Sequence, residues 1–321
     1  MSTAEELWAE LAKTYTIHPE TLRASTRQLS FNFPNPAHLS IEEMRENEKK
    51  LNLKLNGTGT HFDGIVEEID AGGVPATVYR PTSRRAENPT VMVYFHGGGL
   101  LLGSRLTHDR TVKSIAERAG VVVVSVEYRL LPCPEEPMVP FDDALAATRW
   151  VMKNRDVLGG AGSKIGVGGD SAGGQLAVSL THDIQAGLDF MVLVYPAVDF
   201  NLDLPSCREF YRCPGFNTAA MGWIFNITNK PIPDVDTNSR VNAAVRQDLA
   251  KCPPAVIILA QIDPLRDACT NFAEKLQAAG VPVRLHMLEG VPHGFFSRPG
   301  VFPTTCSQAF TFISDFLKEV Q

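Results

Sequence analysis

The sequence lacks the features that mark several specialised classes of protein. Its 321 residues contain no CxxC pair, and no run of cysteine and histidine has the spacing of a zinc site. No apolar run approaches the roughly 18 residues that a membrane-spanning helix needs. The first residues, MSTAEELWAELAKTY, contain neither the basic region nor the apolar region of a secretory signal. We therefore expect a soluble, cytoplasmic protein without an integral membrane segment.

Basic residues are also scarcer than acidic ones. The chain has 30 lysines and arginines against 36 aspartates and glutamates, which gives a net charge of −6. This balance offers no electrostatic attraction for nucleic acid or for an anionic membrane. The charge does not exclude a neutral, apolar small molecule as the ligand. A homodimer is also possible.

The six cysteines give no clear disulfide pattern. Four of them fall loosely between residues 207 and 269. Because no secretory context accompanies them, free thiols are favoured, and a disulfide stays the alternative. A chain of this length buries about three quarters of the surface that its unfolded state exposes, so it does not need disulfides for stability.

From residue 64 onward, strand and helix patterns alternate. Two short strand patterns flank an Ala-Gly-Gly turn and predict a hairpin, at 64–69 and 76–80. Six further strand candidates include continuous apolar runs, typical of strands buried on both faces; they lie at 91–95, 121–128, 165–168, 190–195, 256–260 and 283–288. Helical patterns lie between them, at about 108–119, 141–158, 173–186, 266–279 and 304–319. The order predicts an α/β fold with about eight mostly parallel strands and helices on both faces.

Two segments stand outside this alternation. Residues 1–60 have helical patterns, with capping boxes that begin at Ser2 or Thr3 and at Ser40. A loop rich in helix breakers, FNFPNP, separates the two helices. An insertion at about 200–252 has neither a clear strand nor a simple crossover helix. We expect residues 61–321 to form the main domain, and both segments to form a helical cap over it.

The strongest chemical signal is the pentapeptide GDSAG at residues 169–173. It matches the G-x-S-x-G pattern, follows the strand KIGVG and opens an apolar helix. A turn this tight pushes the serine hydroxyl out above the edge of the sheet. A glycine-rich turn with an incidental serine is the alternative, but the strand–helix context favours Ser171 as a nucleophile. Asp170, beside it, is expected to stabilise the turn.

A second signal is the tetrapeptide HGGG, which begins at His96 and follows the strand VMVYF directly. Acyl transfer places negative charge on the carbonyl oxygen, and each backbone N–H aimed at that oxygen can contribute about 3 kcal/mol. Glycines such as Gly97 allow the backbone to approach closely. The pattern predicts an oxyanion hole, to which the N–H of Ala172 adds a donor. A merely flexible glycine-rich loop is the alternative.

The serine needs a base, which follows it in the chain order of this fold. Three histidines come after the serine. His182 lies in the middle of a helix pattern, and His286 alternates within a strand. His293 lies in the loop EGVPHGFF just after the last strand, where a side chain can reach the serine. The sequence therefore favours His293 as the base.

The base in turn needs an acid that orients it. Asp263 follows the strand AVIILA directly, in the segment QIDPLRD. Asp267 is four residues further on and can instead cap the next helix, so it is the weaker candidate. Asp170 is too close to the serine in sequence. We predict Asp263 as the acid.

These motifs, in the order HGGG, GDSAGG, DPLRD and PHGF, resemble the hormone-sensitive-lipase group of α/β hydrolases, over about residues 64–321. That group includes bacterial family IV esterases, arylacetamide deacetylases and plant carboxylesterases. The resemblance implies an eight-stranded fold with an N-terminal helical cap. It also implies a triad of Ser171, Asp263 and His293, with Gly98, Gly99 and Ala172 as oxyanion donors. One departure is YRLLPC at 128–133, where the group usually has YRLAPE.

The chain is thus expected to be a serine carboxylesterase for short- to medium-acyl esters that needs no metal or cofactor. Leu100 and Leu101, after the glycines, are expected to line a short apolar pocket, which Trp8 and the insertion would cover. The helices could instead cover the sheet elsewhere. An arylamide deacetylase with the same triad stays an alternative, and matched ester and anilide substrates would separate the two. A non-catalytic receptor is a weaker alternative. Plant gibberellin receptors resemble this group but lack the catalytic histidine, whereas His293 is present here.

Overall fold

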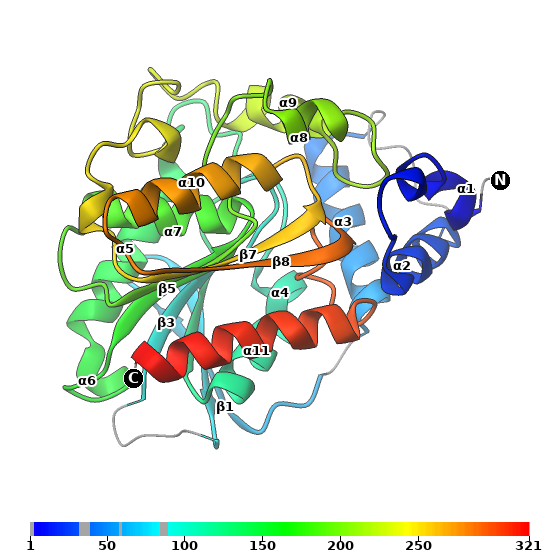
Figure 1. The fold of residues 1–321 in the computed structure, drawn as a ribbon. Helices are drawn as coiled ribbons and strands as arrows, with labels where there is room; N and C mark the ends of the chain where they lie inside the picture. The colour runs from blue at the N-terminus through cyan, green and yellow to red at the C-terminus, as the bar shows by residue number, and fades with distance from the viewer. Residues whose placement is uncertain (1–2, 32–38, 58–59, 84–88, 321) are drawn as a thin grey trace.

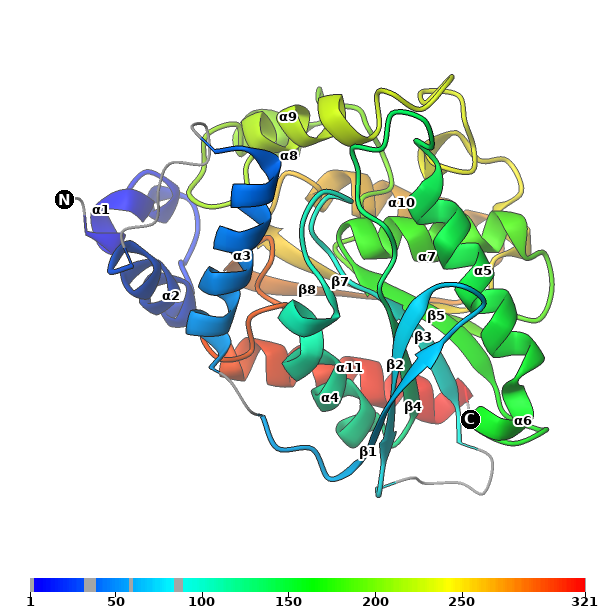
Figure 2. The same cartoon turned by 180° about the vertical axis from the view of Figure 1, so that it is seen from behind.

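The computed structural model describes residues 3–31, 39–57, 60–83 and 89–320. One twisted sheet forms the centre, with helices on both faces (Figure 1 and Figure 2). Its strands are β1 (Gly64–Asp70), β2 (Pro75–Pro81), β3 (Val91–Phe95), β4 (Val122–Val126), β5 (Ile165–Asp170), β6 (Phe190–Val194), β7 (Ala255–Ile262) and β8 (Val283–Pro292). Their order is β1-β2-β4-β3-β5-β6-β7-β8; β1 and β2 run antiparallel to their neighbours, and all other pairs are parallel. The predicted fold class is confirmed.

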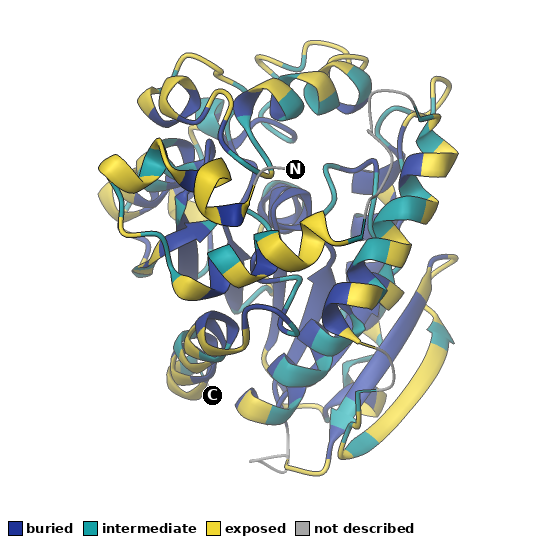
Figure 3. Cartoon of the chain, turned by 90° about the vertical axis from the view of Figure 1, so that its right-hand side faces the viewer, coloured by how far each residue is buried: buried dark blue, intermediate teal, exposed yellow. Residues whose placement is uncertain are grey.

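The strands alternate their side chains between two hydrophobic layers. In β3, Val93 and Phe95 pack on the side of α5, α7 and α10, whereas Met92 and Tyr94 pack on the side of α4 and α11. Successive strand residues point to opposite faces, so a strand covered on both sides must be apolar throughout. Figure 3 shows the contrast between these buried central strands and the largely exposed edge strand β1.

The helices that cover the sheet start and end close to the predicted positions. They are α4 (Arg105–Ala119), α5 (Val139–Lys153), α6 (Arg155–Leu158), α7 (Ala172–Asp183), α10 (Arg266–Ala278) and α11 (Pro303–Val320). The single helix expected at 141–158 is divided into α5 and α6, with Asn154 between them. None of the helices in the described part of the chain is long and apolar enough to cross a membrane.

The N-terminal segment differs from the expected pair of helices. It contains α1 (Ala4–Trp8), the short 3₁₀ helix η1 (Leu11–Lys13), α2 (Pro19–Leu29) and α3 (Ile41–Asn56). The capping boxes at Thr3 and Ser40 are present, but the first helix ends at Trp8 and does not reach Tyr15. The indole N–H of Trp8 donates to Ser25 Oγ at 2.9 Å, so α2 folds back against α1. Most of the loop expected at FNFPNP lies outside the described residues.

The insertion contains short helices above the sheet (Figure 1): α8 (Pro205–Glu209), α9 (Thr218–Thr228), η3 (Ala243–Val245) and η4 (Leu249–Lys251). Trp8 lies in a small buried cluster with Phe210 and Cys213 of the insertion and Ile262 at the end of β7. The two segments outside the α/β alternation therefore contact each other. Their treatment as one cap stays a prediction.

Candidate active site

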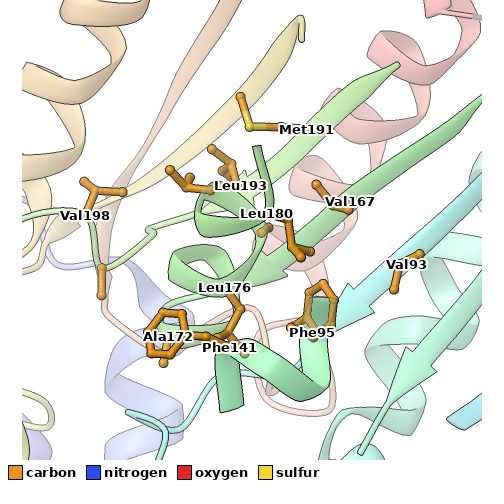
Figure 4. Close-up of a cluster of buried hydrophobic side chains, with 14 of the residues drawn as sticks. Val93, Phe95, Phe141, Val167, Ala172, Leu176, Leu180, Met191, Leu193 and Val198 are labelled. Atoms are coloured by element: carbon orange, nitrogen blue, oxygen red, sulfur yellow. The ribbon is translucent and has the colours of Figure 1, made fainter. Parts of the chain in front are cut away.

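Ser171 lies in the sharp turn between β5 and α7. Its backbone has φ 53° and ψ −118°, in a region that residues with a side chain rarely occupy. A Cβ atom on Gly169 would lie 2.4 Å from the carbonyl oxygen of Phe95, and one on Gly173 would lie 1.9 Å from it. The close approach of β3 therefore requires both glycines of the pentapeptide. Figure 4 shows how α7 then packs through Ala172 and the residues after it into the core.

The structure brings Ser171, His293 and Asp263 into one chain of hydrogen bonds. The distance from Ser171 Oγ to His293 Nε2 is 2.9 Å, and that from His293 Nδ1 to Asp263 Oδ2 is 2.7 Å. Ile262 and Pro292 are partners at the ends of the adjacent parallel strands β7 and β8. The two residues that follow them must therefore emerge side by side. A hydroxyl, an imidazole and a carboxylate are thus assembled at the carboxyl edge of the sheet, in the arrangement that nucleophilic catalysis requires.

The rejected candidates lie elsewhere. The carboxylate of Asp267 accepts a hydrogen bond from Ser206 N at 2.8 Å, which connects α10 to the insertion. The imidazole of His286 stacks on the ring of Phe312, with centroids 3.9 Å apart. The imidazole of His182, near the end of α7, lies 3.4 Å from Asp183 Oδ1 and 3.3 Å from Ser239 Oγ. None of these groups contacts the serine hydroxyl among the described residues.

The glycine loop after β3 lies beside this turn, because Phe95 pairs with Gly169 across the sheet. Gly98 and Gly99 have φ values of 123° and 66°. Among the described residues, no acceptor bonds to the backbone N–H of Gly98, Gly99 or Ala172. An oxyanion hole formed by these three N–H groups stays a prediction. A Cβ on Gly98 would lie only 2.2 Å from the carbonyl oxygen of Leu102, so the loop geometry requires glycine there.

Asp170 connects the glycine loop to the serine turn. Its Oδ1 accepts from Gly97 N at 3.0 Å and from the hydroxyl of Tyr94 at 2.6 Å, and its Oδ2 lies 3.3 Å from His108 Nε2. Burial alone would raise the pKa of Asp170, but the charge of His108 and the hydrogen bonds from His108 and Tyr94 lower it. The carboxylate therefore stays ionised and fixes the two loops relative to each other.

His96, the first residue of the glycine motif, connects the glycine loop to Tyr128. Its ring stacks on Tyr128 with centroids 4.3 Å apart, and the Tyr128 hydroxyl donates to the carbonyl oxygen of His96 at 2.7 Å. Burial, aided by the charge of His108, lowers the pKa of His96 to about 4. His96 is therefore neutral near pH 7. The departure at YRLLPC leaves the contact through Tyr128 intact.

The expectation for Leu100 and Leu101 is wrong. Both side chains are 0% exposed, and Leu100 belongs to the main core. Leu100 has φ 59°, which turns the chain back toward the interior immediately after the glycines. Neither side chain offers surface to a ligand.

Two residues of the insertion, which the sequence did not single out, lie against the site instead. The ring centroids of Phe216 and His293 lie 4.4 Å apart. Tyr195, which follows β6 and is not part of the insertion, also contacts the imidazole, with ring centroids 4.4 Å apart. Ile224 Cγ2 lies 2.7 Å from the place where a Cβ of Gly99 would be, so α9 packs directly on the glycine loop. Only the Asn217 cap before α9 signals this helix in the sequence.

Comparison with known proteins shows similarity to esterases of the same fold. A model of the alpha/beta hydrolase fold family matches residues 92–297. The chain is 36% identical over 293 residues to carboxylesterase NlhH of Mycobacterium tuberculosis, covering 88% of this chain and 84% of that protein. It is 31% identical over 274 residues to ethyl acetate hydrolase of Pseudomonas putida, covering 81% and 85%. Its fold is similar to the hyperthermophilic esterase of Pyrobaculum calidifontis, with a TM-score of 0.82 and 32% identity over 94% of this chain and 98% of that chain.

Proposed function

The chain belongs to the hormone-sensitive-lipase-like group of the α/β hydrolases and is a carboxylic ester hydrolase, and we propose that Ser171, His293 and Asp263 carry out its reaction. The observation that supports this assignment is the unbroken hydrogen-bond chain from Ser171 Oγ through His293 to Asp263. It lies beside backbone donors that no protein group occupies among the described residues.

In the first half of the reaction, His293 Nε2 takes the proton of Ser171 as Oγ attacks the acyl carbon. The electron pair of the carbonyl moves to its oxygen, which then accepts from the N–H groups of Gly98, Gly99 and Ala172. Each such donor contributes about 3 kcal/mol because it is already oriented before charge develops. The imidazolium next gives its proton to the leaving alcohol, and an acyl-enzyme on Ser171 results.

In the second half, water takes the place of the alcohol. His293 accepts a proton from the water as it attacks the acyl carbon, and returns it to Ser171 Oγ when the acid leaves. Asp263 accepts from His293 Nδ1–H throughout, which selects the reactive tautomer and stabilises the imidazolium. The Leu265 N–H donates to the other carboxylate oxygen of Asp263 at 2.8 Å, so the acid itself is fixed.

We further propose that the substrates are short- to medium-acyl esters. Phe216 lies against the imidazole and Ile224 against the glycine loop, and we infer that these two side chains limit the room for the acyl chain. The names of the relatives, carboxylesterase and ethyl acetate hydrolase, favour an ester over an arylamide as the substrate.

The acyl-chain profile tests this proposal. Across 4-nitrophenyl esters from acetate to dodecanoate, kcat/KM should rise at first, because each methylene buried contributes about 0.8 kcal/mol. It should then fall for long chains, once the pocket is full. Replacing Ile224 by alanine should raise kcat/KM for longer chains several-fold relative to butyrate.

Trp223, the neighbour of Ile224 on α9, provides the control. It is 45% exposed, so Trp223→Ala removes a large side chain from the same helix without opening the site. Its profile should match that of the unmodified enzyme. An unmodified enzyme with its optimum beyond about ten carbons would exclude a short pocket, since each added methylene would still find apolar surface to cover.

A cytoplasmic location is part of the same proposal, and the six free cysteines support it, because unpaired thiols are typical of reducing compartments. A homodimer stays a prediction. The edge strand β8 offers a surface for it, with Leu285 and Met287 exposed.

A further inference from the structure

The loop that contains His293 has no regular structure of its own. It begins where β8 ends at Pro292 and finishes where α11 begins at Pro303, and the residues between form turns. Ser171, by contrast, is fixed between a strand and a helix. The position of the imidazole must therefore depend on contacts made by the loop with other parts of the chain.

We propose that two stretches of the N-terminal segment, residues 16–31 and 39–56, position the catalytic histidine, with Asn56 as the principal positioning residue. The proposal rests on the role given to His293 above. It differs from a cap that only covers the substrate, because the contacts reach the backbone on both sides of His293. In Figure 1 the arrowheads of β7 and β8 point toward the N-terminal helices.

The first contact lies before the histidine, at Gly290. Its carbonyl oxygen accepts from His18 N at 3.0 Å and from Thr21 Oγ1 at 2.9 Å. A Cβ on Gly290 would lie 2.2 Å from the carbonyl oxygen of Thr16. The start of α2 is therefore packed against the backbone of β8 three residues before His293, too closely for any side chain at Gly290.

The second contact lies after the histidine and is made by Asn56, the last residue of α3. Its Nδ2 donates to the carbonyl oxygen of Ser297 at 2.8 Å, and its Oδ1 accepts from Gly300 N at 3.0 Å. One buried amide thus connects two points of the loop. A Cβ on Gly300 would lie 2.5 Å from Asn56 Cα, so glycine is again required by the N-terminal segment. Asn52 adds a longer bond to Ser297, at 3.5 Å.

The third contact fixes the end of the loop. The carboxylate of Glu20, on α2, accepts from Thr304 N at 2.8 Å, from Thr305 N at 3.0 Å and from Thr305 Oγ1 at 2.7 Å. Burial would raise the pKa of Glu20, but the hydrogen bonds from Thr305 and Thr304 outweigh burial and lower it. An ionised carboxylate therefore caps the first turn of α11, where the helix dipole also favours negative charge.

A misplaced imidazole has a distinctive kinetic effect. The alkoxide of an ethyl ester leaves only when His293 gives it a proton, whereas 4-nitrophenolate leaves as a stable anion. Displacing the imidazole should therefore slow the ethyl ester more than the nitrophenyl ester of the same acid. A loss of folded enzyme lowers both rates by the same factor, and so leaves their ratio unchanged.

The test is Asn56→Leu, assayed on ethyl butyrate and 4-nitrophenyl butyrate. We expect kcat/KM for the ethyl ester to fall by about tenfold more than that for the nitrophenyl ester, mainly through kcat, since displacements near 1 Å cost up to about a hundredfold in rate. Asn242→Leu is the matched control. Asn242 is also 5% exposed and bonds at both ends of its amide, to Asp236 O and Ala244 N, but within the insertion.

The control should keep the ester ratio of the unmodified enzyme. A folded Asn56→Leu variant with an unchanged ratio would overturn the proposal. If that variant does not fold, Asn56→Asp retains the acceptor for Gly300 and removes the donors to Ser297 O and to Asn52 Oδ1; a shifted ratio supports the proposal and an unchanged one overturns it. Inactivity of the unmodified enzyme on both esters would instead contradict the proposed function.

Discussion

Replacing Ser171 by alanine should reduce kcat for 4-nitrophenyl butyrate by about ten-thousand-fold or more, because the members of a triad act as a unit. The acyl carbon then has no nucleophile, although the oxyanion donors remain. The fold should persist, since the side chain of Ser171 bonds only to His293 among the described residues and alanine removes a single oxygen atom. Steady-state kinetics and a thermal melt measure the two effects separately.

A second serine–histidine pair in the molecule supplies the control. Ser239 Oγ lies 3.3 Å from His182 Nε2, and His182 Nδ1 lies 3.4 Å from Asp183 Oδ1. These distances are longer than in the proposed triad, and the side chain of Arg240 also bonds to Asp183, at 2.7 Å. Ser239→Ala should therefore leave kcat unchanged. If Ser171→Ala lost less than about tenfold, the nucleophile would have to be sought elsewhere, since triad members contribute far more.

Replacing Asp263 by asparagine should reduce kcat by up to about ten-thousand-fold. The amide retains the size of the carboxylate, but its NH₂ group favours the tautomer of His293 that leaves Nε2 unable to accept the serine proton. The unfolding temperature should change little by comparison, because the side chain remains in place. The measurement is kcat at a temperature well below the thermal midpoint of both proteins.

Asp267→Asn is the companion variant, four residues further along the same segment. Its carboxylate accepts from Ser206 N and from Arg266 Nε at 3.0 Å, and so contributes to the junction of α10 with the insertion. We expect a small effect on kcat and a loss of about 1 kcal/mol in the free energy of unfolding, typical of one weakened hydrogen bond. The reverse order of the two variants would transfer the role of the acid to Asp267.

The sheet and the positions of the triad candidates could be predicted because their signals are local. Strands buried on both faces are apolar throughout, and the tight turn at Ser171 needs glycines at fixed spacing. The carboxyl ends of adjacent parallel strands lie at one edge, so residues after β7 and β8 were expected near each other. Chain order left three histidines as possible bases, and the position directly after a strand then favoured His293 and Asp263.

The structure of the N-terminal segment and of the insertion could not be predicted in the same way, because their elements are set by contacts between distant residues. Trp8 ends α1 and buries its ring with Phe210, far away in the sequence, and no period in residues 200–252 indicates that partner. The error at Leu100 has a similar origin. Its positive φ follows from the packing of the glycine loop, and a sequence pattern does not reveal it.

The covalent labelling of the chain by diisopropyl fluorophosphate tests the central claim most directly. The serine oxygen attacks phosphorus, fluoride leaves, and His293 takes the proton, so labelling needs the nucleophile and the base together. We expect one adduct per chain on the peptide that contains Ser171, formed in proportion to the loss of esterase activity and suppressed by excess substrate. The Ser171→Ala variant should remain unlabelled. A stoichiometric adduct on another residue, or full activity in completely labelled protein, would contradict the assignment.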